Sequence, residues 1–364
     1  MRTILLAALL NFATTAAQAQ FILQDSHTTA SLRGIHSIGN GVAWASGTEG
    51  TILRTTDNGA TWQRCTTPPD AEKLDFRGIQ AFDQNTAIVM SSGKGDLSRL
   101  YKTTDACKSW KLVFTNPDKE GFWDAIYMPS SQVGWLLGDP VAGRFRLWST
   151  ADGGKHWTLG SRKGLNAESS LQGAFAASNS SLTTTSSPIW RMAFGTGGRE
   201  GAFFYSIKTL SICLDDCPPS EAEPKENWQR NEVPIASQTE SAGIFSLART
   251  DSVLVAMGGD YKKPDDANRT AAYSIDHGKT WQSSATPPHG YRSSVAYDAK
   301  TKTWITVGPN GTDISRDDGR NWTALKPTPQ DAPDADKNWN ALSLPFVVGP
   351  KGHIGKLHPE ALKP

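Results

Sequence analysis

Short apolar runs separated by turn residues recur along the whole chain, and no long stretch has helical periodicity. Seven runs share a similar opening: LRGIHSI from residue 32, FRGIQAF from 76, WDAIYMP from 123, FAASNSS from 175, FSLARTD from 245, YRSSVAY from 291 and WNALSLP from 339. A second apolar run that ends in small or polar residues follows these openings. Short strands bounded by turn residues are typical of an all-β protein, so the pattern predicts seven similar units.

A second pattern recurs five times, near the end of most units. Its copies are TTDNGATW (55–62), TTDACKSW (103–110), TADGGKHW (150–157), SIDHGKTW (274–281) and SRDDGRNW (315–322). A hydroxyl residue, an aspartate, a turn residue and a tryptophan at these spacings predict a β-hairpin whose aspartate binds backbone N–H groups of the turn. Because the same offset repeats, we interpret the aspartates as structural residues, namely Asp57, Asp105, Asp152, Asp276 and Asp317.

Repetition at this period indicates units arranged radially or in a stack. Seven openings predict a single seven-bladed β-propeller over residues 20–364, and 33 glycines, 21 prolines and 13 tryptophans in 364 residues suit its many turns and aromatic contacts. The fourth unit has an insertion of about residues 207–227 in place of the hairpin, and the seventh has no outer strand. The segment FILQD (21–25) could supply that strand, so we predict that an N-terminal strand closes the ring.

The first 19 residues have the features of a signal peptide. Arg2 precedes a short apolar stretch, and Ala17-Gln18-Ala19 forms a small-x-small cleavage site. We therefore expect an exported protein, periplasmic or extracellular after cleavage near Ala19, with no membrane span. The 37 basic and 36 acidic residues are balanced, which argues against nucleic acid as a partner. We also expect a monomer.

Four cysteines in an exported chain favour disulfides over free thiols. Cys213 and Cys217 lie within the insertion and could form a local bridge. Cys107 occupies the turn position that Gly59 fills in the first hairpin, while Cys65 lies just past Trp62. Neighbouring blades would bring Cys65 and Cys107 together, and this is the second bridge that we expect. The spacings do not fit a zinc site.

Candidate functional residues lie at the start of each first strand, on the face opposite the hairpins. The position after the opening residue holds Arg33, Arg77, Asp124, Ala176, Ser246, Arg292 and Asn340, and nearby second strands end in Asp139 or in Asp260 and Tyr261. The arginines could form a clamp for an anion or carboxylate. Alternatively, Arg33 and Arg77 could pair with Asp124 and Asp139 and hold the blades together.

The hairpin pattern that recurs five times resembles the Asp-box, or BNR repeat, of β-propellers. More distantly, the chain resembles sialidase-like propellers. In more detail, GTILRTTDNGATW, GVAWASG and LRGIHSI resemble the repeat unit of photosystem II stability and assembly factors and their relatives. That resemblance implies a seven-bladed ring that binds a protein segment through a basic patch, for which Arg33, Arg77 and Arg292 are the matching candidates. The sialidase Arg-Ile-Pro signature is absent, since Gly-Ile follows both Arg33 and Arg77.

We predict a non-enzymatic binding or assembly propeller whose partner is a protein segment, a glycan or another anionic ligand. The ligand-binding candidates are Arg33, Arg77, Arg292, Asn340, Asp124, Asp139, Asp260 and Tyr261. The alternative is a glycoside hydrolase that uses Asp124 and Asp139 as acid and base. No motif indicates a cofactor or a metal.

Overall fold

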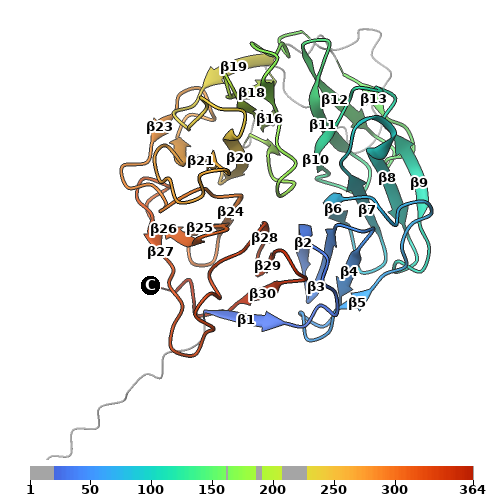
Figure 1. The fold of residues 1–364 in the computed structure, drawn as a ribbon, viewed down its shortest axis with the longest axis horizontal. Coiled ribbons are helices and arrows are strands. Elements are labelled where there is room, and N and C mark those ends of the chain that lie inside the picture. The colour runs from blue at the N-terminus through green and yellow to red at the C-terminus, as the bar shows by residue number, and fades with distance from the viewer. Residues whose placement is uncertain (1–19, 161–162, 186–190, 207–227, 364) are drawn as a thin grey trace, which may run out of the picture.

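The computed structural model describes residues 20–160, 163–185, 191–206 and 228–363. In this part of the chain, seven antiparallel sheets surround a central axis and form a seven-bladed β-propeller (Figure 1). The predicted fold class is therefore confirmed. The expected signal peptide (1–19), the insertion (207–227) and its cysteines, Cys213 and Cys217, lie outside the described residues.

Blades one to three each contain four consecutive strands, ordered from the axis outward. Blade one consists of β2 (Leu32–Gly39), β3 (Val42–Gly47), β4 (Ile52–Thr55) and β5 (Gln63–Arg64). Blade two consists of β6 (Phe76–Ala81), β7 (Ala87–Ser91), β8 (Arg99–Thr103) and β9 (Lys111–Thr115). Blade three consists of β10 (Trp123–Tyr127), β11 (Gly134–Val141), β12 (Arg144–Thr150) and β13 (Thr158–Leu159).

Blade four consists of β15 (Leu182–Thr184), β16 (Met192–Gly195), β18 (Ala202–Ser206) and β19 (Trp228–Glu232). Blade five consists of β20 (Ala242–Arg249), β21 (Leu254–Asp260), β22 (Ala271–Ser274) and β23 (Gln282–Ser283). Two short strands, β14 (Gln172–Gly173) and β17 (Gly197–Gly198), extend the sheet of blade five toward blade four.

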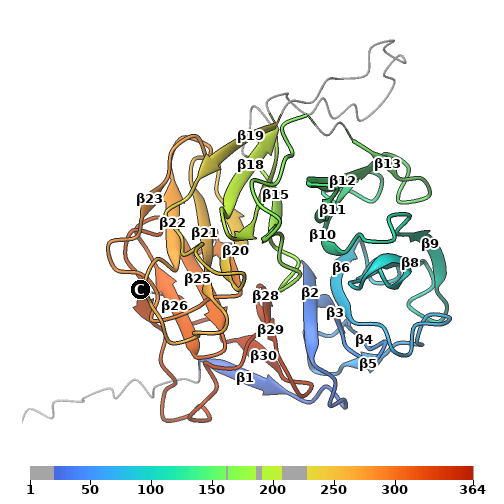
Figure 2. The same cartoon turned by 45° about the horizontal axis from the view of Figure 1, so that its top comes forward.

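Blade six consists of β24 (Ser294–Asp298), β25 (Thr303–Gly308), β26 (Gly311–Ser315) and β27 (Thr323–Ala324). Blade seven combines β28 (Ala341–Ser343), β29 (Phe346–Val348) and β30 (Ile354–Leu357) with the N-terminal strand β1 (Phe21–Gln24). The β1 strand pairs antiparallel with β30 from Phe21 opposite Leu357 to Gln24 opposite Ile354 (Figure 2). The predicted closure of the ring by an N-terminal strand is confirmed.

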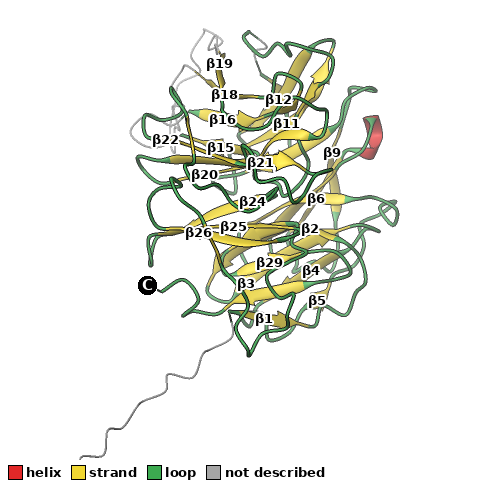
Figure 3. Cartoon of the chain, turned by 60° about the vertical axis from the view of Figure 1, so that its left-hand side comes forward, coloured by secondary structure: helices red, strands yellow, loops and turns green. Residues whose placement is uncertain are grey.

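Helical structure in the described residues is limited to one 3₁₀ turn, η1 (Gly95–Leu97), in the connection between β7 and β8 of blade two (Figure 3). Within those residues, no helix has the length and apolar character needed to span a membrane.

Apolar side chains fill the spaces between neighbouring blades. One cluster joins Trp44 of β3 and Phe76 of β6 to Trp110 of the second Asp-box hairpin. Another brings Trp62 of the first hairpin against Phe346 of β29, with ring centroids 5.5 Å apart. The hairpin tryptophans therefore act as wedges between blades.

A disulfide joins Cys65 to Cys107 and so connects blade one to the turn of blade two. This confirms the predicted pairing of these two residues. Cys107 adopts a left-handed conformation, with φ of 60°, at the turn position that glycine occupies in the other four hairpins.

Hydrogen bonds within each Asp-box hairpin use the aspartate as an acceptor. In the first hairpin, Asp57 accepts from the Thr55 hydroxyl at 2.8 Å and from the Thr61 backbone N–H at 2.9 Å. Asp105, Asp152, Asp276 and Asp317 accept equivalent bonds. Strand pairing puts Leu32 opposite Gly47 and Ala43 opposite Thr55. Arg33 and the hairpin that follows Thr55 therefore lie at opposite ends of the strands, on opposite faces of the ring.

Residues 174–180, here called the crossing segment, run across the axis of the ring. Asn179 exchanges hydrogen bonds with the backbone of Ile126 in blade three, at 2.8 and 3.0 Å. On the other side of the ring, Ser178 donates to the Ser293 carbonyl before blade six, and the Ser180 and Ser246 hydroxyls lie 2.7 Å apart. The light green segment near the ring centre in Figure 1 follows this course.

The crossing segment corrects one sequence prediction. The FAASNSS run from residue 175 was expected to form the first strand of blade four, but that strand is β15 and begins at Leu182. Serine and asparagine side chains readily bond to backbone groups outside a strand ladder. In this run they bind the inner strands of other blades.

Candidate functional site

A cavity of about 550 Å³ opens at the mouth of the central channel, above the crossing segment. It brings together six of the residues predicted from the sequence: Arg33, Arg77, Asp124, Asp139, Tyr261 and Asn340. The other lining residues are mainly Ala174–Ala177 and aromatic side chains of blades three, five, six and seven. No aspartate of an Asp-box lines this cavity.

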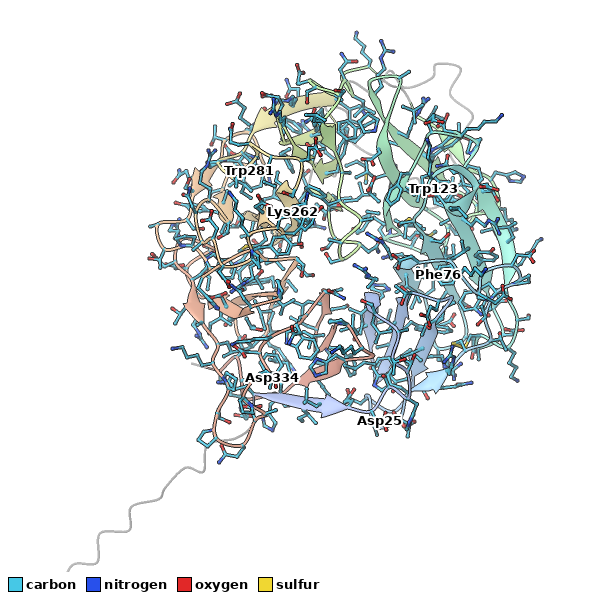
Figure 4. The ribbon with its side chains drawn as sticks, in the orientation of Figure 1. Asp25, Phe76, Trp123, Lys262, Trp281 and Asp334 are labelled. Carbon is cyan, nitrogen blue, oxygen red and sulfur yellow. A yellow bond between two sulfur atoms is a disulfide. The ribbon has the colours of Figure 1, made fainter. Side chains whose placement is uncertain are left out.

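β-Bulges at the start of the inner strands place the key side chains at the cavity. The pairing register shifts between Leu32 and Gly34, between Phe76 and Gly78, and between Trp123 and Ala125, which leaves Arg33, Arg77 and Asp124 as the extra residues. A bulge commonly re-aims a side chain next to a functional site. Figure 4 labels Phe76 and Trp123, which precede Arg77 and Asp124, in neighbouring blades.

Arg33 and Arg77 share a single carboxylate that the sequence analysis missed. The Arg77 Nε lies 2.7 Å from Asp75 Oδ2, whereas the Arg33 Nε lies 4.0 Å from Asp75 Oδ1 and has no hydrogen-bond partner. Arg77 also donates to the Ala176 carbonyl of the crossing segment at 3.1 Å. Burial lowers the pKa of Arg33, and the nearby charge of Arg77 lowers it further. The pair therefore carries positive charge that one aspartate does not neutralise.

Asp124 and Asp139 form a second charged group in the cavity, separate from the arginines. Asp124 is buried and its Oδ2 accepts no hydrogen bond, while Asp139 accepts one from the Ala174 backbone N–H at 2.9 Å. Burial raises the pKa of Asp124 well above its usual value, and the Asp139 charge adds to this effect while Arg77 opposes it. Burial also raises the pKa of Asp139 to about 6. The ion pairs expected between these aspartates and the arginines are not formed.

Asp139→Asn should stabilise the protein at neutral pH. Because the folded protein holds the Asp139 proton up to a pKa of about 6, against 3.8 for a free aspartate, stability falls as pH rises through this interval. Removing the charge should raise the free energy of unfolding by about 2–3 kcal/mol at pH 7.5 and much less at pH 4. Urea titration at the two pH values measures this. The control is Asp251→Asn, at an exposed position. A change in stability of equal size at both pH values in Asp139→Asn would contradict the prediction.

An aromatic wall lines the cavity across the ring from the arginines. Phe175 stacks on Phe245 with ring centroids 3.9 Å apart, and Tyr261 and Tyr291 contact Phe245 edge-on at 6.1 and 4.7 Å. Tyr261 is about half exposed. In Figure 4, the label of its neighbour Lys262 lies on the other side of the ring centre from Phe76. The cavity therefore combines an apolar wall with both signs of charge.

Phe245 also corrects the expected register of blade five. The register shift between Ile244 and Ser246 makes Phe245 the extra residue, so Phe245 and not Ser246 is equivalent to Arg33. Ser246 is buried and its hydroxyl accepts from the Val295 backbone N–H at 2.9 Å. The signal that could have revealed this is the small residue after the bulge, which is Gly34, Gly78, Ala125 or Ser246 in the four blades.

Two predicted residues do not reach the cavity. Arg292 has no exposed surface, and its Nε donates to Asp313 Oδ2 of β26 at 2.7 Å. Tyr291 and Ser293, on either side of it, do line the cavity, as expected when side chains alternate along an extended chain. Asp260 is held by the Lys262 backbone N–H at 3.0 Å and by the Thr239 hydroxyl at 3.1 Å. Of the three arginines predicted as ligand-binding residues, only Arg33 and Arg77 therefore line the cavity.

Asn340 contributes to the cavity and to the ring itself. Its side-chain amide donates to the Leu32 carbonyl at 2.7 Å and so links blade seven to blade one. In the described part of the chain, no three histidine, cysteine, aspartate or glutamate side chains gather as a metal site would require.

Known proteins resemble this chain in its hairpin repeat and in its fold. Residues 272–283, which cover most of the hairpin of blade five, match one family model. That model is the BNR/Asp-box repeat. The resemblance of this hairpin to the Asp-box is therefore confirmed. A search of curated protein sequences gave no match.

Solved structures share the propeller fold across nearly all of this chain. YCF48 bound to D1 peptide is 16% identical with a TM-score of 0.58, and covers 94% of this chain and 98% of its own. YCF48 from Cyanidioschyzon merolae is 17% identical with a TM-score of 0.59, at 94% and 100% coverage. An ancestral GH74 enzyme is 14% identical with a TM-score of 0.53, at 91% and 41% coverage. At these identities the likeness shows the fold alone.

Proposed function

We propose that this protein is an exported, non-enzymatic propeller that binds a protein segment by an anionic group at the channel mouth. The observation that carries the proposal is the sharing of Asp75 by Arg33 and Arg77. Arg33 lines the cavity, and its Nε is left without a hydrogen-bond partner. Guanidinium groups suit carboxylate recognition because they offer paired donors in a planar arrangement. The protein segment would satisfy these donors.

The form of the cavity also supports a protein ligand. Its aromatic wall offers apolar surface to side chains, and its position on a rigid ring means that little ordering is needed on binding. One solved structure with the same fold is that of YCF48 bound to D1 peptide. Peptide recognition is thus compatible with this architecture.

Changing Arg33 and Arg77 to glutamine should weaken binding of peptides with a free C-terminal carboxylate. The probes are heptapeptides from a synthetic library, selected on the purified protein and then measured by calorimetry at low salt. Because each charged hydrogen bond contributes roughly 1.5–3 kcal/mol, we expect at least about a tenfold loss of affinity in the double variant. The melting temperature should change little, since both side chains are about 30% exposed, at 31% and 28%.

The matched control is Arg64→Gln, which removes an exposed arginine of β5 outside the cavity. It should bind the selected peptides like the unaltered protein. Unchanged affinity in the Arg33 and Arg77 variant would show that the arginines do not hold the ligand.

A glycoside hydrolase is the second candidate function. It is favoured by Asp139, whose pKa is raised to about 6 by burial beside the buried Asp124. A carboxyl group with a raised pKa next to another carboxyl group is a common acid and base arrangement in these enzymes. Release of a chromophore from an aryl glycoside panel, stopped by Asp124→Asn, would establish this activity in place of simple binding.

A further inference from the structure

The channel-mouth cavity continues outward into a second cavity of about 790 Å³ toward blades three to five. Asp139, Ala174 and Phe175 line both cavities, so the two adjoin at these residues and are together called the groove. An extended segment with one end at the arginines would follow this groove past Asp139. This inference rests on the proposed function.

Charge along the groove changes sign. Among the residues that line the outer cavity, no lysine or arginine is present, whereas four are acidic: Glu120, Asp139, Glu168 and Glu240. Glu120 pairs with Lys94 at 2.6 Å. Glu168 and Glu240 are exposed and make no ion pair with the described residues. The two arginines therefore lie in the inner part of the groove, and the charged residues that line the outer part are all acidic.

Asp124 independently indicates that a hydrogen-bond donor is missing near Asp139, where the inner and outer parts of the groove adjoin. It lines the inner cavity, only 1% of it is exposed, and its Oδ2 has no hydrogen-bond partner. Arg77 does not fill this role, because it donates to Asp75 and to the Ala176 carbonyl. A buried carboxyl oxygen without a hydrogen-bond partner is costly, and a cation from a ligand would stabilise the ionised form of Asp124 and pair with it.

Phe175 gives the same position an apolar surface. It lines both cavities and stacks on Phe245, with the two rings nearly parallel at 6°. Lysine and arginine place their methylene stems on apolar surfaces while the charged head reaches a polar partner. Phe175 and the two aspartates therefore offer both contacts that a long basic side chain needs.

We propose that Asp124 and Asp139, with Phe175 beside them, form a subsite for a lysine or arginine side chain of the bound protein segment. The acidic rim formed by Glu168 and Glu240 attracts the same charge. The preferred ligand then carries two charges in order along the groove: an anionic group at Arg33 and Arg77, and a basic side chain at Asp124 and Asp139.

A lysine scan of a defined peptide tests this subsite. The probe is acetyl-Gly-Ala-Ala-Phe-Ala-Ala with a free C-terminus, with lysine or its uncharged match norleucine placed at each of the first five positions in turn. We expect one position at which lysine binds about tenfold more tightly than norleucine in calorimetry at low salt. Asp124→Asn and, separately, Asp139→Asn should abolish this preference, while Asp251→Asn should retain it.

The two proposals fail in different ways. If lysine and norleucine bind equally at every position but the Arg33 and Arg77 variant still weakens all peptides, the cation subsite is wrong and the proposed function stands. If no peptide binds, or if that variant binds all of them normally, the proposed function is wrong and the subsite falls with it. A lysine preference that survives both aspartate substitutions also overturns the subsite.

Discussion

Replacing Arg292 with alanine is expected to lower the free energy of unfolding by about 3–5 kcal/mol. The Arg292 guanidinium is fully buried and bonds Asp313 of β26, whose side chain is only 3% exposed. Removing the arginine leaves the Asp313 carboxylate in the interior with the His289 ring nitrogen, at 2.7 Å, as its remaining side-chain partner. Urea denaturation of the purified variant measures the loss.

Two further variants show whether the lost ion pair is the cause. Arg292→Met combined with Asp313→Leu removes both charges and should lose less stability than Arg292→Ala alone. Arg33→Ala removes an arginine that is 31% exposed and should cost about 1 kcal/mol or less. Equal losses for Arg292→Ala and Arg33→Ala would show that the buried pair does not stabilise the fold.

Removing the disulfide should destabilise the protein by about 4 kcal/mol, because the Cys65–Cys107 bridge closes a loop with a sequence separation of 42 residues. The informative variant is Cys65→Ser with Cys107→Gly. Glycine suits the left-handed conformation at position 107, where φ is 60°, so this variant removes the cross-link without straining the turn.

Urea denaturation of this variant, and of the unaltered protein with its disulfide reduced, provides the measurement. Both should unfold at a lower urea concentration than the oxidised protein. If the variant unfolds at the same concentration, the bridge makes no contribution to stability and the packing of Trp44 against Trp110 is enough to hold blades one and two together.

Most of the fold could be predicted because it repeats. The Asp-box spacing recurs five times, and the apolar openings gave the number of blades that the structure shows. Blade four was the exception. The run from residue 175 begins with an aromatic residue like its neighbours, yet its serine and asparagine side chains bind other blades across the axis. Such long-range contacts leave no periodic signal in the sequence.

The candidate site was harder to predict because a shift of one residue decides where a side chain points. Arg77 and Arg292 follow similar openings, but Arg77 is the extra residue of a β-bulge whereas Arg292 turns into the interior of blade six. Asp75 was missed because it belongs to a connection between blades, where no pattern marks it. Repetition locates the strands, and local irregularities locate the functional groups.

Ser178, Asn179 and Ser180 bind residues of blades three, five and six, so the crossing segment is fixed near the centre of the ring. A peptide bound at the channel mouth would therefore have this segment, through Ala174–Ala177, as one wall of its site. The position of that wall would then set how far a chain end or a side chain of the ligand reaches along the ring axis.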